Sequence, residues 1–277
     1  MSSEHPDWLT IVRGEAPLVV SLPHTGTEIP ATYERGLVSP WLARKDADWW
    51  IERLYDFAAG LSATVIRTTI SRTVIDVNRD PSGVSLYPGQ ATTELCPTTT
   101  FDGEPLYAPG TEPTAEEIAA RRARFFDPYH ATLRAEIERL RSSHAHVVVY
   151  DCHSIRSVIP RLFDGTLPHF NIGTNGGVTC SPALSEAIEG ICAGSGFSHV
   201  VNGRFKGGYI TRSLGNPDAG VHAVQMELAC RGYMREPLGS VSEGQWPPPY
   251  DEAYAAPMRA ALTLILQTCL TFAQSKA

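Results

Sequence analysis

The sequence predicts an α/β fold in which a mixed, mainly parallel sheet carries helices on both of its faces. Strand-like and helix-like segments alternate along the 277 residues, and the clearest strand segments are strongly apolar. Hydrophobic residues make up 43% of the chain and charged residues 19%, which is typical of a globular protein. Since no linker rich in proline, glycine and serine divides the chain, we expect one domain over residues 1–277.

The first strand is expected over residues 16–23, an apolar run that ends at His24. A helix is expected over residues 46–60, because its apolar side chains recur at helical spacing and Asp46 or Asp48 can cap its first turn. Asp48 would then lie at a helix start that points toward the edge of the sheet.

Two further strands are expected at residues 63–69 and 72–78, which are rich in β-branched side chains. Residues 80–113 are rich in proline, glycine and threonine and predict a long loop, which inside a compact domain is often functional. A capping box opens a helix over about residues 114–142, and Pro128 should kink or split it.

The remaining segments continue the alternation of strands, loops and helices. They are an apolar strand at 145–151 that leads to His153, a loop at 158–180, a helix at 181–193, a strand at 198–203, a cationic glycine-containing loop at 204–215, a strand at 221–229 and a final helix at about 251–273.

The charge balance narrows the classes of partner. The chain has 23 lysine and arginine residues against 30 aspartate and glutamate residues, a net charge of -7. No basic excess is available to attract nucleic acid or an anionic membrane surface, so we expect neither as a partner. A small anion can still be bound if arginines gather locally.

The N-terminal residues MSSEHPDWLT have neither a basic region nor an apolar run, so no signal peptide is expected. The apolar stretch ALTLILQTCLTF is too short to span a membrane. The six cysteines include no CxxC pair and stand among apolar neighbours, which favours buried, reduced thiols in a cytoplasmic protein.

Polar residues stand where several of the expected strands end. In open α/β sheets the ligand crevice lies beyond the carboxyl ends of the strands. His24 follows one apolar strand, and Asp151 and His153 end another. Residues two apart on a strand face the same side, so Asp151 can orient the ring of His153 or simply pair with it. Cys152 would point to the opposite side, which makes it a poor nucleophile for His153 as base.

Glu227 lies in the apolar strand segment AVQMELA. A carboxylate in such a strand is costly unless it is paired, protonated or beside a metal ion. Catalytic bases are often residues of this kind. The alternative is a buried structural glutamate paired with an arginine.

The segment SRTVIDVNRD gathers charged and polar residues around an apolar strand. Arg72 and Asp76 can pair and brace the strand. Asn78 and Arg79 at its exit remain to bind a carboxylate, because a guanidinium does so through two hydrogen bonds. The loop at 204–215 offers a second cationic group around Gly207 and Gly208, namely Arg204, Lys206 and Arg212, and could either close over an anion or be a solvated loop.

A divalent metal site can be assembled from these strand ends. Catalytic zinc usually has three protein ligands and one water, and neutral imidazoles suit it. His24 and His153 supply two ligands. The third candidate is an acid, Asp48, Asp46 or Glu28; we favour Asp48, although spacing alone does not decide among them.

Taken together, several ordered segments resemble the N-formylglutamate deformylases (N-formylglutamate amidohydrolases). They are SLPHTGTEIP, DADWW, LYDF, SRTVIDVNRD, DCHSIRSVIPRLFDG, NIGTN, NGRFKGGYITR and HAVQMELACRGYM. The likeness covers residues 8 to beyond 235, and the ordered set is highly specific. It implies a zinc-peptidase-like α/β fold and the hydrolysis of N-formyl-L-glutamate to formate and L-glutamate in histidine degradation, with one divalent ion, Zn²⁺.

By position, the resemblance assigns His24 and His153 as metal ligands and Glu227 as general base. Related peptidases carry a glutamate three residues after the first histidine; here that residue is Thr27, and Asp48 takes its place in our assignment.

The substrate has two carboxylates, so two cationic sites are expected. The resemblance assigns Asn78 and Arg79 to one, and we assign Arg212 to the other and Arg72 to the oxyanion.

Two other functions remain open at this stage. A deacylase of the same fold could act on another N-acyl amino acid, since pocket size decides the acyl group. A non-catalytic binder of acidic amino acids is also conceivable, although it would need no base such as Glu227. The oligomeric state is not predicted.

Overall fold

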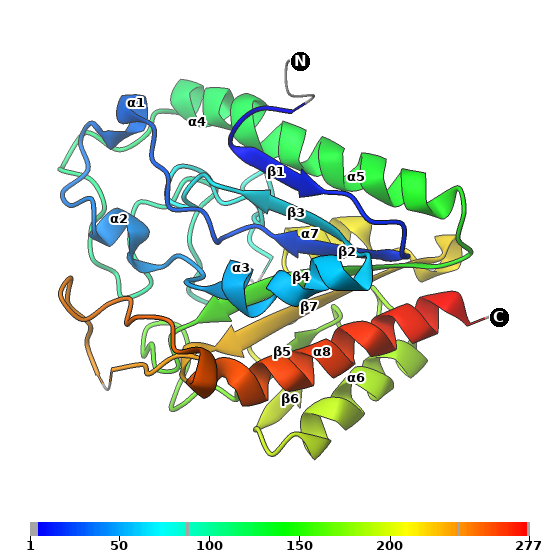
Figure 1. Cartoon of the computed structure of the whole chain (residues 1–277). Helices are drawn as coiled ribbons and strands as arrows, with labels where there is room; N and C mark the ends of the chain where they lie inside the picture. Colours follow the sequence, from blue (N-terminus) through cyan, green and yellow to red (C-terminus); the bar gives the residue numbers. More distant parts are fainter. Residues whose placement is uncertain (1–4, 87–88, 238, 276–277) are drawn as a thin grey trace.

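The computed structural model describes residues 5–86, 89–237 and 239–275. In this part of the chain one seven-stranded sheet runs through the molecule (Figure 1). Its spatial order is β1 (Leu9–Val12), β3 (Thr64–Thr68), β2 (Leu18–Leu22), β4 (Val147–Ile155), β7 (Val221–Ala229), β5 (Phe170–Gly173) and β6 (His199–Val201). Strands β3, β2, β4 and β7 are parallel, whereas β1 and β5 run antiparallel to β3 and β7. The predicted mixed, mainly parallel sheet is confirmed.

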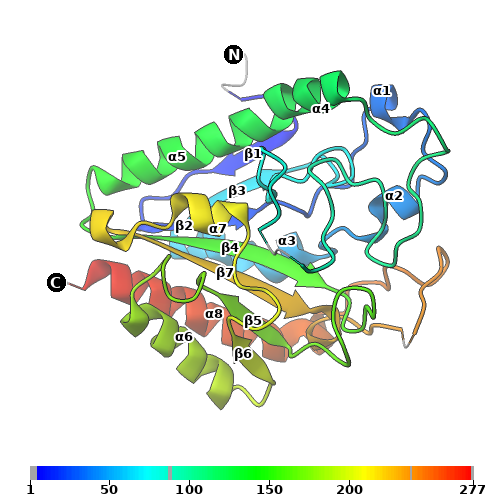
Figure 2. The ribbon, with the colours of Figure 1, turned by 180° about the vertical axis from the view of Figure 1, so that it is seen from behind.

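Helices cover both faces of the sheet, as predicted (Figures 1 and 2). On one face lie α3, α6 and α8, and on the other lie α5 and α7. The α-helices of the described residues are α1 (Ala31–Glu34), α2 (Leu42–Lys45), α3 (Ile51–Leu54), α4 (Ala115–Arg121), α5 (Asp127–Arg141), α6 (Pro182–Gly194), α7 (Tyr209–Leu214) and α8 (Glu252–Gln274).

Because the central strands are parallel, the polar residues at their carboxyl ends lie together at one end of the sheet. Figure 2 shows the arrowheads of β4 and β7 ending among the loops there. In the register of these two strands, Asp151 lies opposite Gln225 and His153 lies opposite Glu227. His24 follows the carboxyl end of β2, the other neighbour of β4. The predicted strand ends therefore meet.

The helix predicted over residues 46–60 is wrong in its first part. The helix α3 begins only after Trp50, whose φ of 65° is left-handed and cannot belong to an α-helix. A 3-10 turn, Asp56–Leu61, follows α3. Neither Asp46 nor Asp48 caps the helix, because both carboxylates bond to other parts of the chain. Asp46 and Asp48 are residue types that often cap helices, but here they bond to Phe101 and His153 instead.

The strand predicted over residues 72–78 is also wrong. Strand β3 pairs with β1 on one side and with β2 on the other, so this segment, which follows β3 in the chain, cannot form a hairpin strand beside it. It forms turns instead: the Val74 amide donates to the Ser71 carbonyl, and the Asp76 amide donates to the Leu95 carbonyl. Its β-branched residues are buried in the core beneath α5 rather than in a ladder.

The long helix predicted at about 114–142 is confirmed, with its cap and its interruption. The Thr114 hydroxyl accepts a hydrogen bond from the Glu117 amide, as a capping residue does. A π-helical turn, Arg122–Phe126, separates α4 from α5, and Pro128 follows it in the first turn of α5. The interruption lies just before the proline, whose ring and missing N–H disturb the preceding helical turn.

Five short elements were not predicted: β1, β5, α1, α2 and α7. The strand β5 lies inside the stretch expected to be a loop at 158–180, and α7 lies inside the cationic loop at 204–215. Elements of four to six residues carry too little periodicity to be recognised. The stretch 80–113 contains no helix or strand among its described residues, as predicted, and residues 87–88 lie outside them.

Among the described residues, α8 is long and apolar enough to cross a membrane by length and composition alone. It extends beyond the apolar run seen in the sequence. In the structure it packs against α6 and the sheet, and its buried residues belong to the core. A core helix meets the same criteria, so α8 is weak evidence for a membrane span.

Candidate active site

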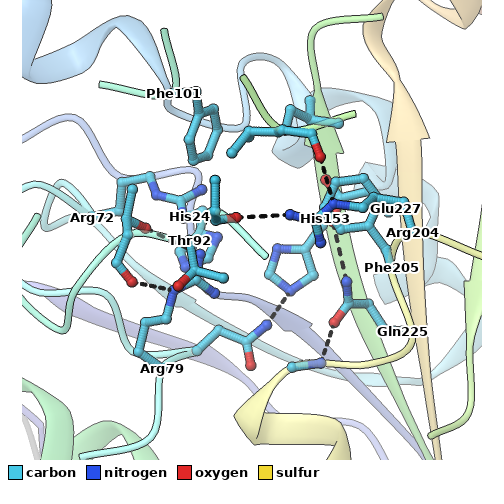
Figure 3. Close-up of a pocket in the computed structure, with 16 residues that line it drawn as sticks. His24, Arg72, Arg79, Thr92, Phe101, His153, Arg204, Phe205, Gln225 and Glu227 are labelled. Carbon is cyan, nitrogen blue, oxygen red and sulfur yellow. Dashed lines mark hydrogen bonds between the residues drawn. The ribbon is translucent and has the colours of Figure 1, made fainter. Parts of the chain in front are cut away.

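Two histidines and one aspartate converge at the carboxyl edge of the sheet. His24 comes from the turn after β2, Asp48 from the turn between α2 and α3, and His153 from β4. One potential ligand atom from each lies within 4.8 Å of the others, and all three side chains are buried. Figure 3 shows the two imidazoles side by side at the centre of the pocket. Residues 129 positions apart in the sequence thus form one site, as the strand-end pattern predicted.

The carboxylate of Asp48 faces the Nδ1 atoms of both imidazoles. Its Oδ2 lies 3.2 Å from Nδ1 of His153 and 3.8 Å from Nδ1 of His24. The other two acids lie elsewhere: Asp46 accepts the amide hydrogen of Phe101, and Glu28 accepts the hydroxyl of Thr69. The geometry therefore favours Asp48 among the three candidates.

The Nε2 atom of each imidazole bonds to a second carboxylate. Nε2 of His24 lies 2.7 Å from Asp76, and Nε2 of His153 lies 2.9 Å from Asp151. A carboxylate accepts hydrogen bonds, so each Nε2 carries the proton and each Nδ1 of a neutral ring offers its lone pair toward Asp48. Carboxylates play this orienting role for metal-bound histidines. The contact of Asp151 was predicted, whereas Asp76 was expected only as a partner of Arg72.

The unpaired atoms of this group test whether a metal ion fits. Nδ1 of His24 and Oδ1 of Asp48 are buried and have no hydrogen-bond partner within the described part of the chain. Buried polar atoms without partners are costly and call for an explanation. Two imidazole nitrogens and a carboxylate oxygen are a donor set that suits Zn²⁺ and several neighbouring divalent ions. The residues present therefore fit a divalent ion.

Burial and neighbouring charges act differently on the two histidines. Burial, aided by the Arg72 charge, lowers the pKa of His24 below its ordinary value. Burial acts in the same direction on His153, but the carboxylates of Asp151 and Asp48 outweigh it and raise the pKa of His153 well above its ordinary value. Without a metal ion, a proton on His153 thus offsets part of the negative charge that a divalent cation would neutralise.

Glu227 lies beside His153 on the neighbouring strand β7 and is 6% exposed. Burial raises its pKa to about 7. The Gln225 amide donates to Oε2 of Glu227 at 3.1 Å, and Gln225 is itself fixed by the amide hydrogen of Gly208 at 2.6 Å. A carboxyl group with a pKa near neutrality, held in one orientation, has the properties of a general base.

Arg72 lies between a carboxylate and an aromatic ring. Its Nη2 donates to Oδ2 of Asp76 at 2.6 Å, so the predicted pair exists, although on a turn rather than a strand. The ring of Phe101 lies 4.6 Å from the guanidinium, at cation–π distance. Burial opposes ionisation of Asp76, but Arg79, His24 and Arg72 together hold its pKa well below the usual range. Asp76 therefore stays a carboxylate that orients both His24 and Arg72.

The side chain of Asn78 is engaged at both ends. Its amide nitrogen lies 3.3 Å from Oδ2 of Asp151 and 2.8 Å from Nε2 of His153, so both nitrogens converge on that carboxylate. Its amide oxygen accepts the N–H of Ile210 at the start of α7. Arg79 donates to the carbonyl and hydroxyl oxygens of Thr93. Asn78 thus links the start of α7 to Asp151, the carboxylate that orients His153.

The predicted residues line one pocket, with the exception of Arg212 and Asp48. Asp48 contacts the two histidines of the lining but does not itself line the pocket. The lining residues of the pocket are His24, Arg72, Asn78, Arg79, Ala91, Thr92, Thr93, Phe101, His153, Ile155, Leu162, Arg204, Phe205, Gly208, Gln225 and Glu227 (Figure 3). Arg212 is not among them; it lies on α7, where its Nε donates to the Gly207 carbonyl. The cation that the 204–215 loop contributes to the pocket is Arg204.

Sequence analysis assigned no role in the site to Phe101, Phe205 or Gln225. The two phenylalanines come from loops, where nothing in the sequence distinguishes them from other surface aromatics. For Gln225 a signal existed, because it shares a strand face with Glu227 two residues later. Thr92 and Thr93 come from the 80–113 stretch, whose functional character was predicted as a whole.

Comparisons with known proteins agree with this arrangement. The sequence model of the N-formylglutamate amidohydrolase family matches residues 16–234. An N-formylglutamate deformylase of Pseudomonas aeruginosa is 45% identical over 269 residues, which cover 97% of this chain and 98% of that protein. An N-formylglutamate deformylase of Pseudomonas putida is 45% identical over 265 residues, 95% of this chain and 96% of that protein.

Solved structures show the same fold. The crystal structure of N-formylglutamate amidohydrolase from Ralstonia eutropha superposes with a TM-score of 0.78 at 24% identity, covering 96% of this chain and 98% of that one. A protein from Agrobacterium tumefaciens superposes with a TM-score of 0.70 at 17% identity, covering 98% of this chain and 97% of that one.

Proposed function

Since this chain belongs to the N-formylglutamate amidohydrolase family, it hydrolyses the amide bond of N-formylglutamate, and we propose that it does so with one divalent metal ion, Zn²⁺. The observation that carries the metal is the convergence of His24, Asp48 and His153, with buried, unpaired ligand atoms turned inward. The ligands would be Nδ1 of both histidines and the carboxylate of Asp48.

In the proposed reaction Glu227 moves the proton. A divalent ion at this site supplies Lewis acidity and lowers the pKa of water to roughly 7. Glu227 accepts a proton from the attacking water, whose oxygen bonds to the formyl carbon. The carbon–nitrogen bond then breaks, Glu227 returns the proton to the leaving nitrogen, and the products are formate and L-glutamate. Its pKa near 7 suits both transfers.

Arg72 is proposed to stabilise the negative charge that develops on the formyl oxygen. Its guanidinium lines the pocket and is fixed by Asp76 on one side and by the ring of Phe101 on the other. A donor that is held in place before the reaction loses little free energy to reorganisation when the charge appears.

The two substrate carboxylates need two cationic positions. Arg79 and Arg204 line the pocket from different loops, and each is anchored by hydrogen bonds to backbone carbonyls. We assign one carboxylate to Arg79, with Asn78 beside it, and the other to Arg204 in place of Arg212. In this assignment Arg212 supports the loop through Gly207.

The reaction is proposed to be the last step of one route of histidine degradation, in the cytoplasm. All six cysteines are free and buried, which agrees with a reducing compartment. The substrate is a small molecule.

Release of formate from N-formyl-L-glutamate tests the proposal, with metal-chelated and Zn²⁺-reconstituted protein side by side. We expect the chelator to abolish release and Zn²⁺ to restore it. Release that a strong chelator leaves unchanged, in protein free of metal by elemental analysis, would contradict the metal. N-Acetyl- and N-succinyl-L-glutamate in parallel test the acyl group, and cleavage of these alone would make the chain a different deacylase.

A further inference from the structure

Four residues of the site come from one irregular segment, 72–79. This segment supplies Arg72, Asp76, Asn78 and Arg79, yet it forms neither helix nor strand. Its backbone polar groups therefore lack the regular partners that a ladder provides, and buried carbonyls need other donors. Two of these donors are buried side chains of one helical unit, α4–α5.

The first donor is His130 of α5. Its Nε2 lies 2.7 Å from the carbonyl oxygen of Val77, to which it donates. Val77 stands between Asp76, which bonds to the imidazole of His24, and Asn78, which contacts that of His153. One hydrogen bond thus fixes the peptide between the two residues that support the two proposed ligands.

His130 behaves as a fixed donor rather than a titrating group. It is 1% exposed, and its ring packs against Phe126 and Tyr209. Burial lowers its pKa to about 4, so the ring is neutral near pH 7 and its single proton lies on Nε2. Its Nδ1 has no hydrogen-bond partner among the described residues.

The second donor is Arg121 of α4. Its Nη1 donates to the carbonyl oxygen of Val74 at 2.9 Å. The guanidinium is 1% exposed and is held by Glu117 and by the ring of Tyr33. Val74 lies midway between Arg72 and Asp76, so this bond fixes the other half of the segment.

The π-helical turn brings the two donors to the same side. His130 comes nine positions after Arg121, and at about 100° per residue the two would stand on opposite faces of an unbroken α-helix. A π-turn takes up about one additional residue, which leaves the two side chains about 80° apart. The turn Arg122–Phe126 lies between them. Its position accounts for how one helix can hold two carbonyls of the same segment.

We propose that Arg121 and His130 are positioning residues, which hold segment 72–79 so that Asp76 meets the imidazole of His24 and Asn78 meets Asp151, the carboxylate that orients His153. The inference rests on the proposed metal site for its function, but its structural part does not. It assigns the π-turn a role in the site, although neither Arg121 nor His130 lines the pocket.

The test compares variants of one helix. His130→Phe keeps an aromatic ring and removes the donor, whereas His130→Gln can present an amide N–H. Leu133→Val is the matched control, because Leu133 lies one turn further along in the same core and, as an apolar side chain, donates no hydrogen bond to the segment. Zinc affinity is measured by competition with a chromophoric chelator, and melting temperature is recorded for each variant.

We expect His130→Phe to lose about tenfold in zinc affinity, the low end for changes in groups that orient metal-bound histidines. His130→Gln should recover most of it, and Leu133→Val should lower the melting temperature while leaving zinc affinity within about twofold. A His130→Phe protein that is destabilised like the control but binds zinc like the wild type would overturn the inference.

A second readout is independent of the metal. In metal-free protein, ¹⁵N shifts of the His24 ring report whether Nε2 holds the proton. We expect one tautomer in the wild type and in His130→Gln, and a mixture in His130→Phe. Unchanged ¹⁵N shifts in His130→Phe would contradict the inference, whether or not the wild type binds a metal ion. A wild type that binds no metal ion would instead contradict the proposed metal site alone. If His130→Phe does not fold, Arg121→Lys replaces it and the same two readouts are recorded. Weaker zinc binding together with a mixture of His24 tautomers would support the inference, and wild-type values of both would overturn it.

Discussion

The two faces of the sheet differ most clearly along β4, where neighbouring residues face opposite chemical environments. Tyr150 and Cys152 belong to the apolar core beneath α3, α6 and α8. Asp151 and His153, which alternate with them, face the site. On β7 the same alternation separates Met226 in the apolar core from the catalytic face. One strand therefore serves packing on one side and chemistry on the other.

This difference between the two faces indicates which of them contributes the free energy of folding. The face beneath α6 and α8 is apolar from Val148 to Cys152 on β4 and from Val224 to Leu228 on β7. The opposite face begins with Val147 and Val149 in the core under α5 and changes to carboxylates and imidazoles at the carboxyl end. Buried charges without full pairing are destabilising, so the first face must contribute the free energy that the second one needs.

The largest expected effect is on the catalytic face. Glu227→Gln removes the proposed base while keeping the shape of the side chain, so kcat should fall by about 10²–10⁴-fold with little change in KM. The variant should be no less stable than the wild type. Steady-state kinetics together with thermal unfolding check this, and a kcat within threefold of the wild type would exclude Glu227 as the base.

Met226→Ala is the opposite case on the neighbouring residue. Truncation of this fully buried side chain should lower the free energy of unfolding by about 2–5 kcal/mol. The folded fraction should keep its kcat within about twofold, since Met226 faces away from the site. Denaturant titration and kinetics at low temperature separate the two effects. A loss of kcat as large as that of Glu227→Gln would contradict the claim that Met226 contributes to packing only.

The pH dependence of stability is expected to expose the cost of the catalytic face. In metal-free protein burial raises the pKa of Glu227 from 4.5 to about 7. Between these values the unfolded chain has lost a proton that the folded chain retains, so stability falls as pH rises through this window. Glu227→Gln lacks this loss. Relative to the wild type, the variant should gain up to about 3 kcal/mol between pH 4 and pH 8, by denaturant titration at each pH. A constant difference would contradict the assignment.

The smallest expected effect concerns a carboxylate that supports the site from outside the sheet. Asp76→Asn weakens the hold on Nε2 of His24, so zinc affinity should fall about 10–100-fold. Asp56→Asn, on the surface and paired only with Arg259 among the described contacts, serves as control and should not change it. Chelator competition measures both variants. Equal affinities would show that Asp76 serves Arg72 alone.

Sequence analysis predicted the sheet type, the long helices and the strands that end in the site, because long apolar runs and strand-end polar residues carry a strong local signal. It also predicted His24, His153, Glu227 and their meeting. The ligand set stayed open, because nothing local distinguishes Asp48 from Asp46; their different partners, the Phe101 amide for Asp46 and the imidazoles for Asp48, come from distant parts of the chain.

Other errors have the same origin in tertiary context. The segment 72–78 has the composition of a strand, but both sides of β3, the strand before it in the chain, are already paired with β1 and β2. Arg212 stands in the matching loop, yet it lies on α7 and donates to the Gly207 carbonyl, and Arg204 lines the pocket instead. Neither the occupancy of a strand edge nor the start of a six-residue helix can be derived from local residue patterns.

The most direct measurement is a crystal structure of zinc-loaded protein with anomalous diffraction recorded on both sides of the zinc edge. The account predicts one strong peak contacted by Nδ1 of His24, Nδ1 of His153 and the carboxylate of Asp48, with Glu227 nearby but not a ligand. A peak at other residues, ligation through the Nε2 atoms, or no peak in crystals saturated with zinc would contradict it.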